Sequence, residues 1–356
     1  MCFKGIILKC ITFMKENRSI SGIYHLLSGK KSIQSVHDAK IFNLEGLYGI
    51  YPALTMIDFL DCVQQMVAGG LIKKGKTDNY YDITDRGEQY LKQSDVTSIL
   101  CYFNGIKYYG RDVTFLERLF LIIQTLSNIQ KGNTTFIPVI DRPSITNWTK
   151  KFYTTIKGNR RNFTIKLYEE LYELLNQLPE KEANIFVDRL SGYKYYGMSV
   201  EQLSEKHSLT KHDVILYLTG VTHHLIVKIE QNQERFTVLY SLLRDLEQTK
   251  FITNTAKQTY QLLCNHFTVS EIASMRNLKL NTIYDHIVEI VLYDKEFTID
   301  TFVTKQEQAI ILQAIHKYNT YKLKIIKDNT TSSISYFQIR LVLARLEELR
   351  LEGPHV

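Results

Sequence analysis

Most strong hydrophobic patterns in this chain repeat about every 3.6 residues, the spacing that places apolar side chains on one face of a helix. One such stripe contains Ile165, Tyr168, Leu171, Tyr172 and Leu175. Glycine and proline, which destabilise helix interiors, number only 17 and 5 in 356 residues. The helical period and the shortage of helix breakers argue against a sandwich or barrel and predict a mostly α chain.

The length of 356 residues allows two or three domains, and the sequence divides into three blocks. We predict a winged-helix-like domain over 1–104, a helical domain over 110–248 and a helix-turn-helix domain over 249–350. The turn-forming pair Asn104-Gly105 marks the first junction. The last six residues, 351–356, read LEGPHV and are expected to be a vector-derived tail.

Cysteine usage and the N-terminal segment bear on the cellular compartment. The five cysteines include no CxxC pair, so neither a disulfide framework nor a zinc knuckle is predicted. A cytoplasmic location is expected, and association with the nucleoid stays open. The apolar stretch from Gly5 to Met14 contains Lys9 and is too short to span a bilayer, so no membrane partner is expected.

The first block contains an ordered local pattern between residues 55 and 91. A helix over residues 56–67 ends at Gly69-Gly70, where glycine supplies the left-handed conformation that closes a helix. Two short strands, 71–73 and 80–83, flank a polar turn, and Thr84 caps the helix that follows. On the first helix we expect one apolar side made of Met56, Phe59, Leu60, Val63 and Val67.

This order of elements resembles the winged-helix transcription regulators, in which the hairpin is the wing. A basic wing tip can contact phosphate in that family. The candidates for such contacts here are Lys73, Lys74 and Lys76. A wing that only completes a fold used for protein docking is the alternative, because a motif defines shape and not ligand.

The second block contains two consecutive capping-box patterns, Ser199 with Gln202 and Thr210 with Asp213. The unit resembles the fourth region of bacterial sigma factors, although Ser208 stands where a glycine is usual. In DNA-binding relatives the residues after the second cap face outward and enter the major groove. Here they are Lys211, His212 and Ile215, with Leu216 a further candidate. The apolar members suit a protein partner as well as a base edge.

The third block contains the most specific motif, over residues 269–287, which resembles the helix-turn-helix of LuxR-type regulators. Asn277 takes the turn position that requires a positive φ. Lys279 replaces the usual hydroxyl cap, which weakens that end of the helix or moves the cap to Asn281. The core positions are Ile272, Leu278, Ile283 and Ile287, and the outward candidates are Asn281, Thr282, Asp285 and His286.

The wider order of the third block resembles the helicase helix-turn-helix domain at the C-terminus of some RecQ-type DNA helicases. The whole chain resembles the YpbB-like proteins of Firmicutes, which have an N-terminal region of this length and no helicase core. The resemblance implies a helicase-associated role in DNA repair or recombination. It also implies two partners: a RecQ-type DNA helicase, and DNA that is single-stranded, forked or duplex.

Basic and aromatic residues alternate in the second block. Interleaving of this kind suits the backbone and bases of a single strand. Lys157, Arg160 and Arg161 are the leading candidates, and a solvated face over core aromatics is the alternative. The full set is Trp148, Lys150, Lys151, Phe152, Tyr153, Lys157, Arg160, Arg161, Phe163 and Lys166.

No motif for catalysis or cofactor binding occurs. The chain lacks GxxxxGK[ST], GxSxG, HExxH and GxGxxG, so we expect a non-enzyme with no cofactor and no metal. His223-His224 lacks metal-ligand spacing and is expected to be an ordinary surface pair.

The predicted fold class is mostly α, with tandem helix-turn-helix and winged-helix modules and one small β-hairpin wing. The leading functional hypothesis is an accessory factor of a RecQ-type helicase that binds the helicase, DNA or both. A sequence-specific transcription regulator is the first alternative, and a scaffold that binds only proteins is the second.

Overall fold

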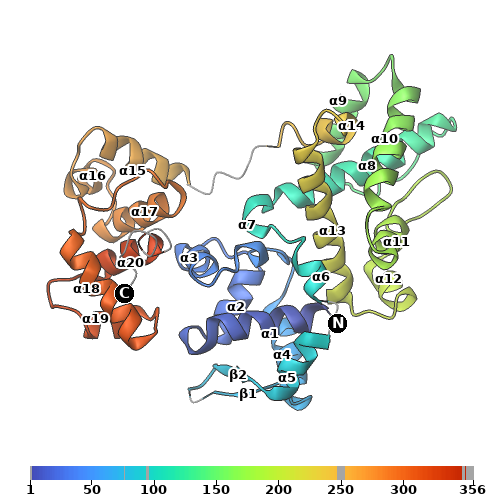
Figure 1. Cartoon of the computed structure of the whole chain (residues 1–356). Coiled ribbons are helices and arrows are strands. Elements are labelled where there is room, and N and C mark those ends of the chain that lie inside the picture. Colours follow the sequence, from blue (N-terminus) through green and yellow to red (C-terminus); the bar gives the residue numbers. More distant parts are fainter. Residues whose placement is uncertain (1, 76, 94–95, 247–252, 347–348, 350–356) are drawn as a thin grey trace.

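The fold was established from a computed structural model that describes residues 2–75, 77–93, 96–246, 253–346 and 349. These residues form helices joined by short connections, together with a single two-stranded hairpin (Figure 1). The predicted fold class, mostly α with one small β-hairpin, is therefore confirmed. Lys76 and the tail 351–356 lie outside the described residues, so the expectations for them stay predictions.

The first block contains the predicted hairpin beside a group of helices. The strands pair antiparallel with Ile72 opposite Ile83. Gly70, with φ of 66°, closes the helix before the first strand, and the Thr84 hydroxyl accepts a hydrogen bond from the Gly87 N–H at 3.2 Å. The elements are α1 (Cys2–Met14), η1 (Lys15–Asn17), α2 (Ile20–Leu27), α3 (Ile33–Ile41), η2 (Glu45–Leu47), α4 (Met56–Ala68), β1 (Ile72–Lys74), β2 (Tyr81–Ile83), α5 (Asp85–Gln93) and α6 (Val96–Leu100).

The second block is built on two long helices, α8 and α13. Both predicted capping boxes are present, and Ser208 has the positive φ, 51°, that a glycine usually supplies at that turn. The elements are α7 (Gly105–Tyr108), α8 (Arg111–Gln130), α9 (Pro143–Thr155), α10 (Arg160–Leu175), α11 (Glu180–Asp188), α12 (Val200–Lys206), α13 (Lys211–Gln231) and α14 (Thr237–Ser241).

The third block contains two groups of three helices. The helix-turn-helix predicted over 269–287 lies in the first group, and α20 of the second group packs against α17 of the first. The sequence analysis did not recognise α18, α19 and α20 as a group. The elements are α15 (Asn254–Cys264), α16 (Val269–Met275), α17 (Leu280–Tyr293), α18 (Lys305–Tyr318), α19 (Leu323–Asp328) and α20 (Tyr336–Ala344).

The first two blocks share one core, because α13 packs against α1. The carboxylate of Asp213, fully buried, accepts a hydrogen bond from the backbone N–H of Phe3 at 2.8 Å. The expectation that His223 lies on the surface is wrong. Its ring is buried between the blocks, where it accepts from the Asn104 N–H at 3.0 Å and contacts Asp112 at 3.1 Å.

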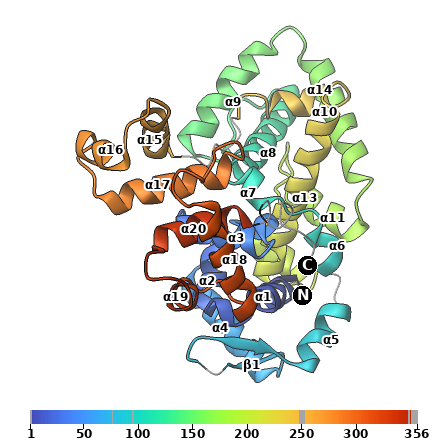
Figure 2. The ribbon, with the colours of Figure 1, turned by 60° about the vertical axis from the view of Figure 1, so that its left-hand side comes forward.

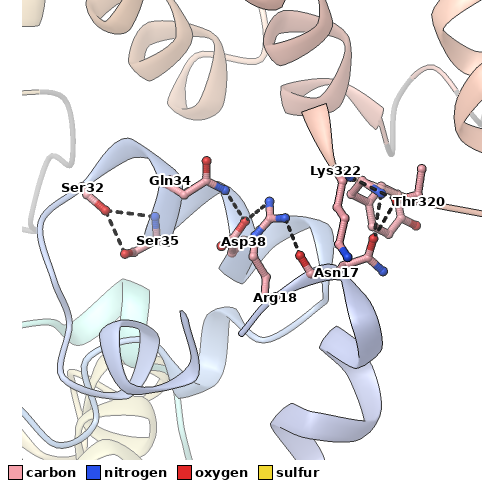
Figure 3. Close-up of polar contacts among 9 residues, drawn as sticks. Asn17, Arg18, Ser32, Gln34, Ser35, Asp38, Thr320 and Lys322 are labelled. Atoms are coloured by element: carbon pink, nitrogen blue, oxygen red, sulfur yellow. Dashed lines mark hydrogen bonds and ion pairs between the residues drawn. The ribbon is translucent and has the colours of Figure 1, made fainter. Parts of the chain in front are cut away.

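The third block lies against the first, with α17 and α20 beside α3 (Figures 1 and 2). The Asn17 side-chain oxygen accepts hydrogen bonds from the Tyr321 N–H at 2.9 Å and the Thr320 hydroxyl at 3.1 Å (Figure 3). The Lys322 amine lies 4.8 Å from the centre of the Tyr80 ring on the wing. Polar contacts of the first block thus hold the connection between α18 and α19 in place.

Two predicted apolar stripes are partly wrong. On α4, Leu60 and Val67 face solvent, and the buried side consists of Phe59, Cys62, Val63 and Met66. On α10, Ile165, Tyr168 and Tyr172 are exposed, and the buried side consists of Phe163, Leu167, Leu171, Leu174 and Leu175. In both cases the helical period was right and the assignment of the inner side was displaced.

Replacing Asp213 with Ala should lower the free energy of unfolding by roughly 2–4 kcal/mol. The change removes the Asp213 half of the α13 capping box, in which the carboxylate accepts from Thr210, worth about 1 kcal/mol, and leaves the buried Phe3 N–H unpaired, at about 1–3 kcal/mol. Urea denaturation of the full chain measures the loss. Asp61→Ala, at an exposed position of α4, is the matched control and should stay within about 0.5 kcal/mol of wild type. Equal stabilities of the two variants would contradict this role of Asp213.

His37 on α3 is buried, and its Nε2 atom has no hydrogen-bond partner. Burial and the nearby Arg18 guanidinium lower the pKa of His37 to about 3, although a hydrogen bond with the backbone of Leu343 on α20 acts the other way. The imidazole is therefore neutral in the folded protein and charged in the unfolded chain below pH of about 6.5.

Stability should accordingly fall as the pH drops below the unfolded pKa of His37, because the unfolded chain binds the extra proton. Between pH 7 and pH 5 the wild type should lose about 2 kcal/mol more unfolding free energy than His37→Gln, which cannot titrate. Urea denaturation of both proteins at the two pH values tests this. Parallel pH profiles would show that His37 is not held neutral.

Candidate nucleic-acid interface

The exposed side of α4, the helix that leads into the wing, has no basic residue. Its solvent-facing side chains include Ile57, 74% exposed, together with Leu60, Asp61, Gln64 and Val67. A helix with this surface cannot neutralise phosphate charge.

The wing itself remains a candidate for phosphate contact. Lys73 and Lys74 are exposed on β1, as the sequence predicted. The backbone of the hairpin is fixed to the first block, since the Asn79 carbonyl accepts a hydrogen bond from the Ile20 N–H at 2.8 Å.

The predicted outward face of α13 contacts the first block. The Lys211 amine pairs with Asp58 of α4 at 2.9 Å, and the His212 ring lies 4.8 Å from the Phe3 ring and contacts the Tyr51 hydroxyl at 3.0 Å. Burial and Lys211 lower the pKa of His212, so it is neutral near pH 7.

The apolar residues that follow on α13 complete this contact surface. Ile215 is half-buried and Leu216 is 1% exposed. Of the residues predicted to face outward, Lys211 is exposed but paired with Asp58, whereas His212 and Ile215 are half-buried, so the prediction is wrong for these two.

The helix-turn-helix of the third block forms as predicted. Ile272, Ile283 and Ile287 are fully buried, and Leu278 packs partly buried against the same core. Asn277 has a φ of 51°, the left-handed conformation that the turn requires. The cap does not move to Asn281, because α17 begins directly after Lys279, whose side chain makes no capping hydrogen bond.

Of the four residues predicted to face outward on α17, only Asn281 is freely exposed. Thr282 is half-buried, and Asp285 pairs with Arg340 of α20 at 2.7 Å. The prediction is wrong for His286, which is 7% exposed and bonds through Nδ1 to the Thr259 hydroxyl at 2.9 Å. Burial first, and the Arg276 guanidinium second, lower the pKa of His286.

The aromatic and the basic residues of the predicted cluster have different roles in the structure. The aromatic rings pack on one another: Trp148 stacks on Phe152 at 4.7 Å, and Phe152 meets Phe163 edge-on at 5.6 Å. Arg160 lies 4.0 Å from the centre of the Tyr153 ring. These rings join α9 to α10, whereas the basic side chains Lys150, Lys151, Lys157, Arg161 and Lys166 are exposed.

The part of the chain that the structure describes contains no group of three His, Cys, Asp or Glu side chains placed to hold a metal ion. Within the same residues, none of the helices combines the length and the apolar character needed to cross a bilayer.

Comparison with known proteins agrees with the class of fold seen in the third block. Residues 255–343 match a family described as a helix-turn-helix domain, and this match supports DNA binding. Over almost its full length, the chain is similar to protein YpbB of Bacillus subtilis (strain 168). The two are 27% identical over 344 residues, which cover 96% of this chain and 97% of YpbB. The chain is therefore YpbB-like. No solved structure matches it.

The N-terminal end of α13 should behave as structure and not as a DNA-reading surface. Lys211→Ala should leave the salt dependence of DNA binding unchanged, whereas loss of a phosphate contact on duplex DNA would lower the slope by about 0.9. Leu216→Ala should destabilise the fold by roughly 2–5 kcal/mol, because it opens a cavity. Fluorescence anisotropy over a salt series and urea denaturation measure the two effects. A reduced slope for Lys211→Ala would return this residue to the DNA interface.

Proposed function

We propose that the chain is a non-catalytic accessory factor of a RecQ-type DNA helicase, acting in the cytoplasm during DNA repair or recombination. The third block resembles the helix-turn-helix domain that ends some helicases of that type. The chain is also similar to YpbB over nearly its whole length, and the resemblance to YpbB-like proteins is what implies a helicase partner. In this proposal the chain supplies binding surfaces and the helicase supplies the chemistry.

One observation carries the proposal. Side chains near the N-termini of the helices that were expected to read a DNA sequence make contacts within the protein. A regulator reads base edges with free side chains near the N-terminus of a recognition helix. Here Lys211 is paired with Asp58, and Asp285 is paired with Arg340. His286 is buried. These contacts argue against the reading as a sequence-specific regulator and favour binding that depends on DNA charge and structure.

The helicase partner can be tested by co-purification with the full chain. A RecQ-type helicase should be retained on the immobilised chain, and a helicase of another family is the control. Nuclease treatment of the mixture distinguishes direct contact from joint binding to DNA. A helicase that binds no better than the control would contradict the proposal.

DNA preference separates this function from that of a transcription regulator. A regulator should prefer one duplex sequence over random DNA by about 10³-fold or more. The accessory factor should bind forked or single-stranded DNA with little sequence preference. Selection from a random duplex pool followed by anisotropy measures the ratio, and an operator-like preference would favour the regulator.

A further inference from the structure

The formal net charge of the whole chain is concentrated in one short segment. From Arg142 to Tyr168 there are seven lysines and arginines and no aspartate or glutamate. Without these seven, 37 of the 44 basic residues remain, which equals the 37 acidic residues of the chain. The net charge of +7 therefore corresponds to this segment alone, and the rest of the protein is balanced. The segment includes α9, the turn over residues 156–159 and the first half of α10, which together we name the basic hairpin.

The charges of the basic hairpin are available to a ligand. Arg142 pairs with Glu117, but among the described residues no carboxylate lies within ion-pair distance of the six others. Five of the six are exposed, namely Lys150, Lys151, Lys157, Arg161 and Lys166. Two basic residues at or beside the helix-turn-helix motifs differ, because Lys211 of α13 and Arg340 of α20 are each paired with an aspartate.

The position of the basic hairpin keeps its surface open. α9 and α10 lie at the end of the molecule opposite to the wing in both ribbon views (Figures 1 and 2). The turn carries Lys157, and α10 begins with Arg160 and Arg161 and has no acidic residue in its first turn. Cations at this end of a helix oppose the helix dipole, so their presence is unfavourable for folding and points to an external anion.

A row of exposed apolar side chains continues from these charges along α10. Arg161, Ile165, Tyr168 and Tyr172 follow at intervals of four, three and four residues and therefore share one face. Tyr168 and Tyr172 are 67% and 59% exposed, and their rings stack with centres 5.9 Å apart. Exposed aromatic rings are the platforms on which unpaired bases stack, because every base has a π face.

We propose that the basic hairpin binds an unpaired nucleic-acid strand, with phosphates near Lys157 and Arg161 and bases against Tyr168 and Tyr172. The inference rests on the DNA-binding half of the proposed function and is independent of the helicase partner. A duplex would meet the charges equally well, but its bases are stacked on one another and cannot reach the tyrosines. The tyrosine row therefore favours the single strand.

The test measures binding of a labelled oligothymidine of about 20 nucleotides to the purified full chain. Fluorescence anisotropy gives the binding constant at salt concentrations from about 50 to 200 mM. Lys157→Ala combined with Arg161→Ala should weaken binding and lower the slope of log K against log salt by about 1.4, near 0.7 per lost contact. Tyr168→Ala combined with Tyr172→Ala should weaken binding by roughly 5- to 150-fold per stacked base and leave the slope unchanged.

Two adjacent exposed lysines of the first block, Lys30 and Lys31, supply the matched control. Lys30→Ala combined with Lys31→Ala removes the same charge from a site outside every candidate surface and should leave strand binding and its slope as in wild type. A wild-type slope in the hairpin variant, or an equal loss in the Lys30/Lys31 variant, would overturn the site. Wild-type affinity in the tyrosine variant, or preference for a duplex of the same length, would overturn the single-strand ligand. Helicase co-purification after nuclease treatment tests the helicase partner separately, because that measurement does not depend on strand binding.

Discussion

One buried carboxylate organises the arrangement of the first two blocks. Asp213 completes the capping box of its own helix, α13, with the N-cap Thr210, and it also accepts a hydrogen bond from the backbone N–H of Phe3 in the first turn of α1. The first N–H groups of a helix have no partner within it, so this oxygen satisfies a donor that would otherwise be buried and unpaired. A negative charge at both N-termini is also favourable for the two helix dipoles. The crossing of α1 and α13, and hence the shared core, depends on this contact.

The same crossing changes what the helix-turn-helix of the second block can do. Because α1 and α4 lie against the start of α13, the side chains there make contacts within the protein and do not enter a DNA groove. The ability to bind a polyanion is then expected elsewhere, and the net positive charge lies around α9 and α10, outside the wing and both helix-turn-helix motifs. The helix-turn-helix of the second block acts as a structural part in this arrangement, and the proposed binding surface on α9 and α10 is separate from it.

Local chemistry was predictable from the sequence, and contacts between blocks were not. Capping boxes, the left-handed turn at Asn277 and the wing hairpin depend on neighbouring residues, so the sequence predicted each of them. The buried position of His223 depends on Asn104, 119 residues away in the chain. The buried position of His286 depends on packing within its own block, against Thr259 of α15.

Parts of the binding site were visible in the sequence as well. The basic residues of the hairpin were identified because charge is a property of composition. The tyrosines of α10 were assigned to the core because the hydrophobic period alone does not distinguish a buried face from an exposed aromatic face.

The contact between α13 and the first block has a consequence for sequence variation among relatives. A surface that reads DNA changes together with its target sequence, but this face should change together with α1 and α4. Substitutions at Lys211 should coincide with substitutions at Asp58, whatever DNA each relative meets.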